Sequence, residues 1–153
     1  MKSAIDNGVD IIRIGCNSSD IDIIEKQFLY CRKNKVDAWC VFMMFHQILS
    51  KKKYLKIIKD LKTFGLKTFI VMDSAGILLP EDIVRIFKSL KKLNIESGFH
   101  GHNNLGCAVT NTLEAVKNGA KIIDCSLRGF GAGAGNAQLE VVLAILNKMK
   151  IVK

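Results

Sequence analysis

The sequence is poor in the features that divide a chain into domains or attach it to a membrane. Its 153 residues include a single proline, and no Ser- and Gly-rich linker interrupts them, so one continuous domain over residues 1–153 is expected. No apolar run is long enough to span a bilayer, and residues 1–7 form no apolar signal segment. These absences predict a cytoplasmic protein that does not associate with membranes.

Paired cysteines are also absent. The five cysteines are odd in number, form no Cys-x-x-Cys pair and lie mostly inside apolar runs, which predicts the reduced, buried thiols of a cytosolic protein. Acidic residues are scarce, with 14 Asp and Glu against 23 Lys and Arg and a formal charge of +9. The excess lysines have helix-like spacing and few interleaved aromatic residues, so they favour a solvated helix exterior over a nucleic-acid surface.

The chain alternates between two kinds of segment. Short apolar, β-branched runs, predicted as strands, cover residues 9–15, 36–44, 68–72, 95–102 and 121–126. Amphipathic stretches with a helical period, predicted as helices, cover residues 20–34, 51–64, 80–93, 106–118 and 137–149. Residues 2–7 are typical of the end of a further helix. Five βα units with almost wholly apolar strands predict an α/β fold whose parallel strands are buried on both faces.

Two architectures fit five βα units, an open doubly wound sheet and part of a (β/α)₈ barrel. Polar residues follow nearly every predicted strand, at Cys16 and Asn17, His46, Asp73 and Ser74, His100 and His102, and 128–136. An open sheet gathers its ligands at one switch point, whereas a barrel draws its catalytic residues from the ends of many strands. The pattern therefore favours a partial TIM (β/α)₈ barrel that supplies five of the eight units.

Two histidines in the fourth predicted strand are the strongest candidate for chemistry. His100 and His102 are two residues apart, so in a strand both imidazoles point to the same face and can reach one point in space. Two converging neutral imidazoles commonly hold a divalent metal, and with oxygen ligands they suit Mn²⁺, Mg²⁺ or Zn²⁺. Two hydrogen-bonded histidines at a strand end are the structural alternative.

A glycine-rich loop follows the last predicted strand. Residues 129–136 hold four glycines in their first seven positions, which permits a sharp turn or close approach of the backbone to another group. The loop enters the last predicted helix, whose free N–H groups would attract a carboxylate. It matches neither a Walker loop nor the dinucleotide-binding spacing. A tight strand-to-helix turn and a carboxylate-binding role both remain open.

Other polar residues admit more than one interpretation. Ser74 can donate a hydrogen bond to a substrate oxygen and Asp73 can orient a histidine, although a plain turn also explains them. His46 is better explained as a structural residue. Arg13 interrupts an apolar strand and needs an acidic partner, which is a substrate acid, Asp73 or Asp124.

Three segments resemble the metal-dependent aldolase and acyl-transfer barrels, the family of 4-hydroxy-2-oxovalerate aldolase, 3-hydroxy-3-methylglutaryl-CoA lyase and 2-isopropylmalate synthase. These are residues 98–104, 120–127 and 131–140, and the aldolase branch is the most similar. The resemblance implies that His100 and His102 are metal ligands, with Mn²⁺ preferred over Mg²⁺ or Zn²⁺. It implies that Ser74 and His100 contact the substrate and that Asn136 is an amide ligand of the metal. The implied reaction is reversible cleavage of a 4-hydroxy-2-oxoacid to pyruvate and an aldehyde.

The resemblance covers strands four to eight of the family's barrel. The Arg-Asp pair on the family's first strand and the catalytic His that follows it have no counterpart here, so the catalytic residues are unknown. We expect the chain alone to be weakly active or inactive, because five strands cannot close an eight-stranded barrel. A polypeptide that supplies the missing strands and an acetaldehyde dehydrogenase are the implied partners. A Claisen-type acyl transferase of the isopropylmalate synthase type and a non-catalytic barrel subunit are the alternative functions.

Overall fold

Five parallel strands form a single sheet in the order β1-β2-β3-β4-β5. The computed structural model describes residues 1–152, with the side chains of all of these except residues 21 and 22. The strands are β1 (Ile11–Cys16), β2 (Asp37–Phe42), β3 (Thr68–Asp73), β4 (Glu96–Gly101) and β5 (Ile122–Asp124). A sheet whose strands follow one another in chain order has the arrangement of a barrel, whereas the order reverses in a doubly wound sheet.

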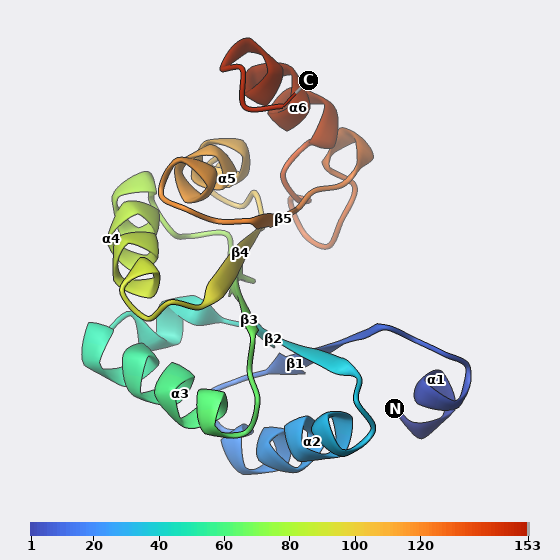
Figure 1. Ribbon diagram of the computed structural model, residues 1–153. Helices are drawn as coiled ribbons and strands as arrows, with labels where there is room; N and C mark the ends of the chain where they lie inside the picture. The colour runs from blue at the N-terminus through green and yellow to red at the C-terminus, as the bar shows by residue number, and fades with distance from the viewer. Residues whose placement is uncertain (153) are drawn as a thin grey trace.

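Each strand is followed by a helix. The α-helices are α1 (Lys2–Asp6), α2 (Ile21–Lys33), α3 (Lys51–Thr63), α4 (Pro80–Lys91), α5 (Ala108–Lys117) and α6 (Leu139–Lys148), with short 3₁₀ turns η1 (Phe45–Ile48) and η2 (Leu127–Gly129). Figure 1 shows α2 to α5 in an arc along one side of the sheet, with α6 beyond α5. No helix within residues 1–152 is both long and apolar enough to cross a membrane.

Residues alternate between the two faces of the sheet. The face toward the helices is apolar, and Cys40, Phe69 and Phe99 are fully buried there in one cluster with helix residues such as Phe28 and Phe87. This burial supplies the main driving force for packing the helices on the sheet. All five cysteines are free thiols, as predicted, but only Cys16, Cys31 and Cys40 are buried, whereas Cys107 and Cys125 are partly exposed.

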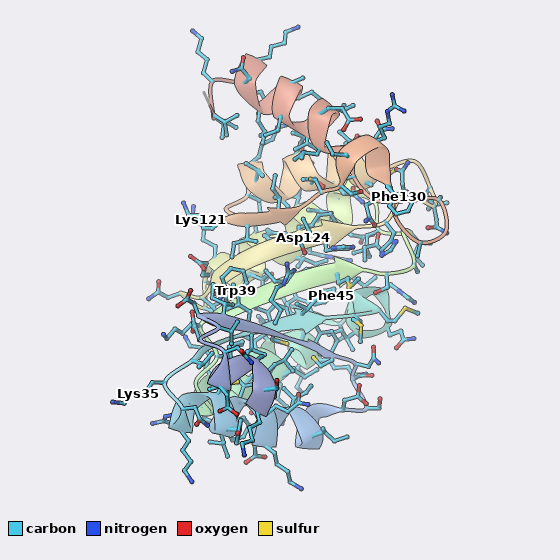
Figure 2. The ribbon with its side chains drawn as sticks, turned by 90° about the vertical axis from the view of Figure 1, so that its right-hand side faces the viewer. Lys35, Trp39, Phe45, Lys121, Asp124 and Phe130 are labelled. Atoms are coloured by element: carbon cyan, nitrogen blue, oxygen red, sulfur yellow. The ribbon has the colours of Figure 1, made fainter. Side chains whose placement is uncertain are left out.

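The opposite face of the sheet carries polar groups. Arg13 pairs with Trp39 across β1 and β2, and Met72, His100 and Asp124 are neighbours across β3, β4 and β5. Figure 2 looks onto this face, with Trp39 and Asp124 labelled over the sheet. The strand register therefore places a charged cluster on the concave side, where the interior of a complete barrel would lie.

The five predicted βα units and the predicted helix at residues 2–7 are confirmed, and the differences lie at strand ends. The second strand stops at Phe42, because Met44 adopts a left-handed conformation with φ 50°. The fourth stops at Gly101, so His102 lies beyond it and bridges to Asn136. The fifth is three residues long, since the chain after Asp124 leaves β4 and Ser126 bridges to Gln138, just after the glycine-rich loop.

Candidate metal and substrate site

The candidate site residues gather at the carboxyl ends of β3, β4 and β5. Parallel strands end at a common edge of the sheet, which brings residues from distant parts of the sequence together. His102 lies beyond β4 in a backbone bridge with Asn136. Its N–H also donates to the Asp73 carbonyl at 3.3 Å. Ser74 follows β3 at the same edge.

The two histidine rings lie close together. The centroids of His100 and His102 are 5.1 Å apart, with an interplanar angle of 48°. Histidine nitrogens bind a metal such as zinc at about 2.1 Å, and rings at this separation are close enough to share one ion. The two imidazoles therefore lie side by side, although His102 is beyond the end of β4.

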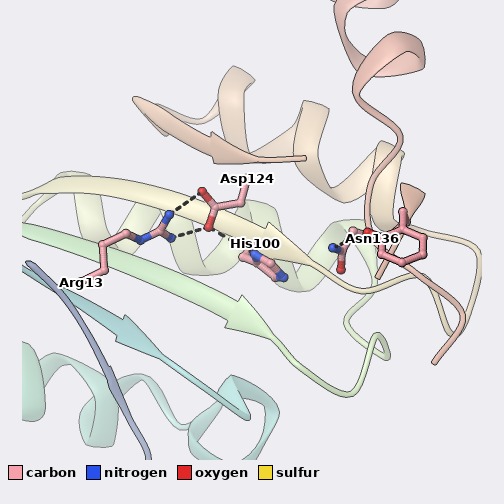
Figure 3. A network of polar contacts seen from close by, with 5 residues as sticks. Arg13, His100, Asp124 and Asn136 are labelled. Carbon is pink, nitrogen blue, oxygen red and sulfur yellow. Dashed lines mark hydrogen bonds and ion pairs between the residues drawn. The ribbon is translucent and has the colours of Figure 1, made fainter. Parts of the chain in front are cut away.

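A carboxylate holds one side of the His100 ring. Asp124 Oδ2 lies 3.2 Å from His100 Nδ1, and the same carboxylate forms a two-pronged ion pair with the Arg13 guanidinium, whose Nη1 is 3.0 Å from Oδ1. Figure 3 shows His100 between Asp124 and Asn136, with Arg13 on the far side of the carboxylate. The acidic partner of Arg13 is therefore Asp124, which settles an alternative left open by the sequence.

The same contacts fix the charge of Asp124. Burial alone would raise its pKa, but hydrogen bonds from His100 and Arg13, together with the positive charge of Arg13, outweigh that effect. The pKa of Asp124 falls from its ordinary 3.8 to about 2. The carboxylate is therefore ionised at neutral pH and accepts hydrogen bonds only.

Two buried polar atoms beside this network have no hydrogen-bond partner. They are His100 Nε2 and Asn136 Oδ1, whereas Asn136 Nδ2 donates to the Phe130 carbonyl at 3.3 Å. A buried acceptor without a partner costs about 1–3 kcal/mol. A bound cation would satisfy both atoms, so the residues present fit a divalent metal held by nitrogen and oxygen.

The protein ligands alone do not complete a metal site. Among residues 1–152, outside the side chains of 21 and 22, no group of three or more His, Cys, Asp or Glu side chains converges on one point. Three candidate ligands lie near one another, because the rings of His100 and His102 are side by side and the backbone of His102 bridges to that of Asn136. Remaining coordination positions would be left to substrate oxygens, water or groups outside this chain.

The glycine-rich loop brings Asn136 close to the chain at Gly131. A Cβ atom on Gly131 would lie 2.5 Å from Asn136 Nδ2, closer than any side chain tolerates. Gly135 has φ 86°, which a residue with a Cβ rarely adopts. On the other side of the loop, both carboxylate oxygens of Glu140 accept the N–H of Arg128, at 3.0 and 3.1 Å. The glycines therefore allow the close approach that positions the amide.

Ser74 and Asp73 have separate roles. Ser74 Oγ accepts the Met44 N–H at 3.0 Å, which leaves its own O–H free to donate. Asp73 is fully buried, and its carboxylate accepts the N–H groups of Ile77 and Leu78 at 3.2 and 2.9 Å. The hypothesis that Asp73 orients a histidine is therefore wrong, because its oxygens are used to hold a turn.

Sequence reasoning missed the residue that contacts His100. Asp124 entered it only as one candidate partner of Arg13. The signal that could have found it is strand register, since His100 and Asp124 occupy paired positions in β4 and β5. His46, interpreted from the sequence as a structural residue, lies in η1, and its buried Nδ1 has no hydrogen-bond partner among the described residues.

An open groove runs beside the network on the concave face. Its volume is about 570 Å³, and its lining residues include Arg13, Val41, Met72, His100 and Asp124. A second groove of about 460 Å³ lies at the opposite ends of the strands, next to Asp10 and Asp37, away from the candidate site. The first groove is the one that gives a small molecule access to His100.

A sequentially ordered parallel sheet with polar residues at its carboxyl edge is typical of barrel-type α/β proteins. The family model described as HMGL-like matches residues 4–153, and the chain belongs to this family. A relative from Spirochaeta aurantia named 4-hydroxy-2-oxovalerate aldolase is 41% identical over 152 residues, which cover 99% of this chain and 44% of the relative. A protein of the same name from Pectobacterium atrosepticum is 40% identical over 150 residues, covering 97% and 43%.

Solved structures agree on the fold. The Bacillus subtilis HMG-CoA lyase aligns with a TM-score of 0.85 at 17% identity, covering 99% of this chain and 60% of that one. The carboxyl transferase domain of Rhizobium etli pyruvate carboxylase aligns with a TM-score of 0.84 at 19% identity, covering 95% and 26%. The chain spans less than half the length of these curated aldolase relatives, so it corresponds to a part of such a barrel.

Proposed function

We propose that this chain carries the metal- and substrate-binding part of an aldolase that cleaves a 4-hydroxy-2-oxoacid to pyruvate and an aldehyde. The observation that carries the proposal is the pair of buried, unpartnered acceptors, His100 Nε2 and Asn136 Oδ1, beside the His102 ring. The identity of 41% with a protein named for this reaction supports the choice of substrate class. The shared name of the two relatives described above favours an aldolase over a Claisen-type acyl transferase.

The cation would be held by His100, His102 and Asn136. Two imidazoles and an amide oxygen suit Mn²⁺, or alternatively Zn²⁺, better than Mg²⁺, which prefers oxygen ligands throughout. When bound, the metal would withdraw electron density from the 2-oxoacid and stabilise the negative charge that develops as the carbon–carbon bond breaks.

The chain's own residues bind and orient the substrate. The free O–H of Ser74 donates to an oxygen of the 2-oxoacid, and the exposed edge of His100 contacts the same molecule at the groove. Arg13 does not bind the substrate carboxylate, since its guanidinium is already engaged by Asp124.

The five strands correspond to strands four to eight of a complete barrel, and residues 1–153 form a single incomplete barrel domain. Sheet edges at β1 and β5 have unpaired backbone groups that further strands would pair. Strands outside these residues complete the barrel, and we expect the chain alone to be weakly active or inactive. A cytoplasmic location and an acetaldehyde dehydrogenase partner stay predictions.

A complementation experiment tests the proposal. The full 153-residue chain is mixed with the part of the Spirochaeta aurantia aldolase that precedes the matched region, and pyruvate release from 4-hydroxy-2-oxovalerate is followed with Mn²⁺ present. We expect activity in the mixture, little in either part alone, and loss of activity when the chain carries His102→Ala. Equal activity of the His102→Ala mixture would contradict the proposal. Release of free CoA from an acyl-CoA substrate, without pyruvate release, would favour the acyl transferase.

A further inference from the structure

One nitrogen of the His100 ring has a hydrogen-bond partner and the other has none in the part of the chain that the structure describes. Its Nδ1 lies 3.2 Å from Asp124 Oδ2, while its Nε2 is buried without a partner. A neutral imidazole carries one proton, which can sit on either nitrogen, and the group bound at one nitrogen decides which. Since the ionised carboxylate only accepts, the proton belongs on Nδ1 and the lone pair on Nε2.

Arg13 in turn fixes the carboxylate. Its guanidinium contacts both oxygens of Asp124, with Nη1 3.0 Å from Oδ1. A two-pronged contact of this kind sets the plane of a carboxylate as well as its position. The side chains of His100 and Asp124 are each 19% exposed, so water competes little for these contacts. Arg13 therefore positions Asp124, and Asp124 in turn contacts the His100 ring.

We propose that Arg13 and Asp124 are positioning residues that orient His100 and select the tautomer with a free Nε2 lone pair for the metal. The inference rests on the proposed function, because it assigns the lone pair to a cation. Carboxylate or carbonyl groups behind a ligating histidine commonly fix its orientation, and their removal weakens metal binding by about 10- to 100-fold. Neither residue touches the metal or the substrate in this account.

A structural role alone would produce a different result. The Arg13–Asp124 pair joins β1 to β5, the two edges of the sheet, so its removal also lowers stability. The tautomer of His100 is the readout that a purely structural contribution would not change. It is observed in the metal-free chain by ¹⁵N–¹H correlation spectra of the imidazoles at pH 8.

The experiment compares four variants of the full chain with the unmodified protein. Asp124→Ala removes the acceptor, Asp124→Asn keeps an oxygen that can accept the Nδ1 proton, and Arg13→Leu removes the guanidinium alone. Asp60→Ala breaks the exposed pair with Lys56 on α3 and is the matched control. Each variant is titrated with Zn²⁺, which is diamagnetic, and its fold is checked by circular dichroism.

In the unmodified chain and the control, we expect the proton on Nδ1 and equal Zn²⁺ affinity. In Asp124→Ala, we expect the proton to move to Nε2 and the affinity to fall about 10- to 100-fold. Asp124→Asn keeps the original tautomer and restores most of the affinity, and Arg13→Leu has an intermediate affinity. If Asp124→Ala does not fold, the proposal is tested with Arg13→Leu. A Zn²⁺ affinity of Arg13→Leu equal to that of the Asp60→Ala control would overturn the proposal.

The outcomes separate this inference from the proposed function. An unmodified chain that binds no Zn²⁺ would overturn the proposed function, and the inference with it. Zn²⁺ binding by a folded Asp124→Ala variant with unchanged tautomer and affinity would overturn the positioning role alone.

Discussion

We expect the free energy of unfolding to fall at acid pH because Asp124 becomes protonated. The pKa of Asp124 is lowered from 3.8 to about 2, because hydrogen bonds from His100 and Arg13 and the charge of Arg13 outweigh the opposing effect of burial. A carboxyl group whose pKa is lower in the folded protein stabilises the fold above its unfolded pKa. This contribution is complete above about pH 5 and is lost as the pH falls from about 4 toward 2.

The size of the effect follows from the pKa. A tenfold change in acid strength corresponds to about 1.4 kcal/mol, so the full contribution is at most about 2.4 kcal/mol. The Arg13 side chain is 40% exposed, and screening by water lowers the expected value to about 1–2 kcal/mol. About half of this is lost by pH 3.

The assay is urea unfolding, followed by circular dichroism at pH 7, 5 and 3, for the unmodified chain and for Asp124→Asn. The free energy of unfolding of the unmodified chain should exceed that of the variant by about 1–2 kcal/mol at pH 7 and 5, and by about half as much at pH 3. The matched control is Asp60→Asn, whose partner Lys56 is 78% exposed, and its effect should not exceed about 0.5 kcal/mol at any pH. A difference for Asp124→Asn that is the same at pH 7 and pH 3 would refute the reasoning.

Three further substitutions test individual contacts. Gly131→Ala places a Cβ 2.5 Å from Asn136 Nδ2 and displaces this amide. The affinity for Mn²⁺, measured calorimetrically, should therefore fall about tenfold or more, as when other ligands lose their orientation. Unchanged affinity would contradict the role of the loop. Ser74→Ala leaves the Met44 N–H without its acceptor and should lower the free energy of unfolding by about 1 kcal/mol, and no change in urea unfolding would contradict the contact. Asp73→Ala leaves two backbone N–H groups unpaired and should lower the free energy of unfolding by about 2–4 kcal/mol, with metal affinity retained. Loss of metal affinity in a folded variant would show that Asp73 is more than structural.

The βα repeat could be predicted from the sequence because it depends on local pattern. Apolar β-branched runs such as residues 68–72 alternate with stretches of helical period such as 80–93, and β3 and α4 lie there. A spacing of two residues also predicts that His100 and His102 lie side by side, as they do, although His102 lies beyond β4 and its backbone bridges to Asn136. Predicting the βα repeat therefore needs no knowledge of distant contacts.

The contacts behind the histidines could not be predicted in the same way. Arg13 and Asp124 are 111 residues apart, and they meet because the sheet curves until its two edge strands face each other. Asp73 and Asp124 both lie near strand ends and were equivalent candidates for Arg13 from the sequence. The register of β4 against β5, which pairs His100 with Asp124, is a property of the assembled sheet.

Direct measurement of metal binding tests the central claim, that His100, His102 and Asn136 hold one divalent cation. Mn²⁺ is titrated calorimetrically into the full chain and into His100→Ala, His102→Ala and Asn136→Ala, with His46→Ala as the control because it removes the remaining histidine. We expect one site per chain, unchanged in His46→Ala and weakened about 10-fold or more in each of the other three. Binding that survives unaltered in His100→Ala and His102→Ala would contradict the account.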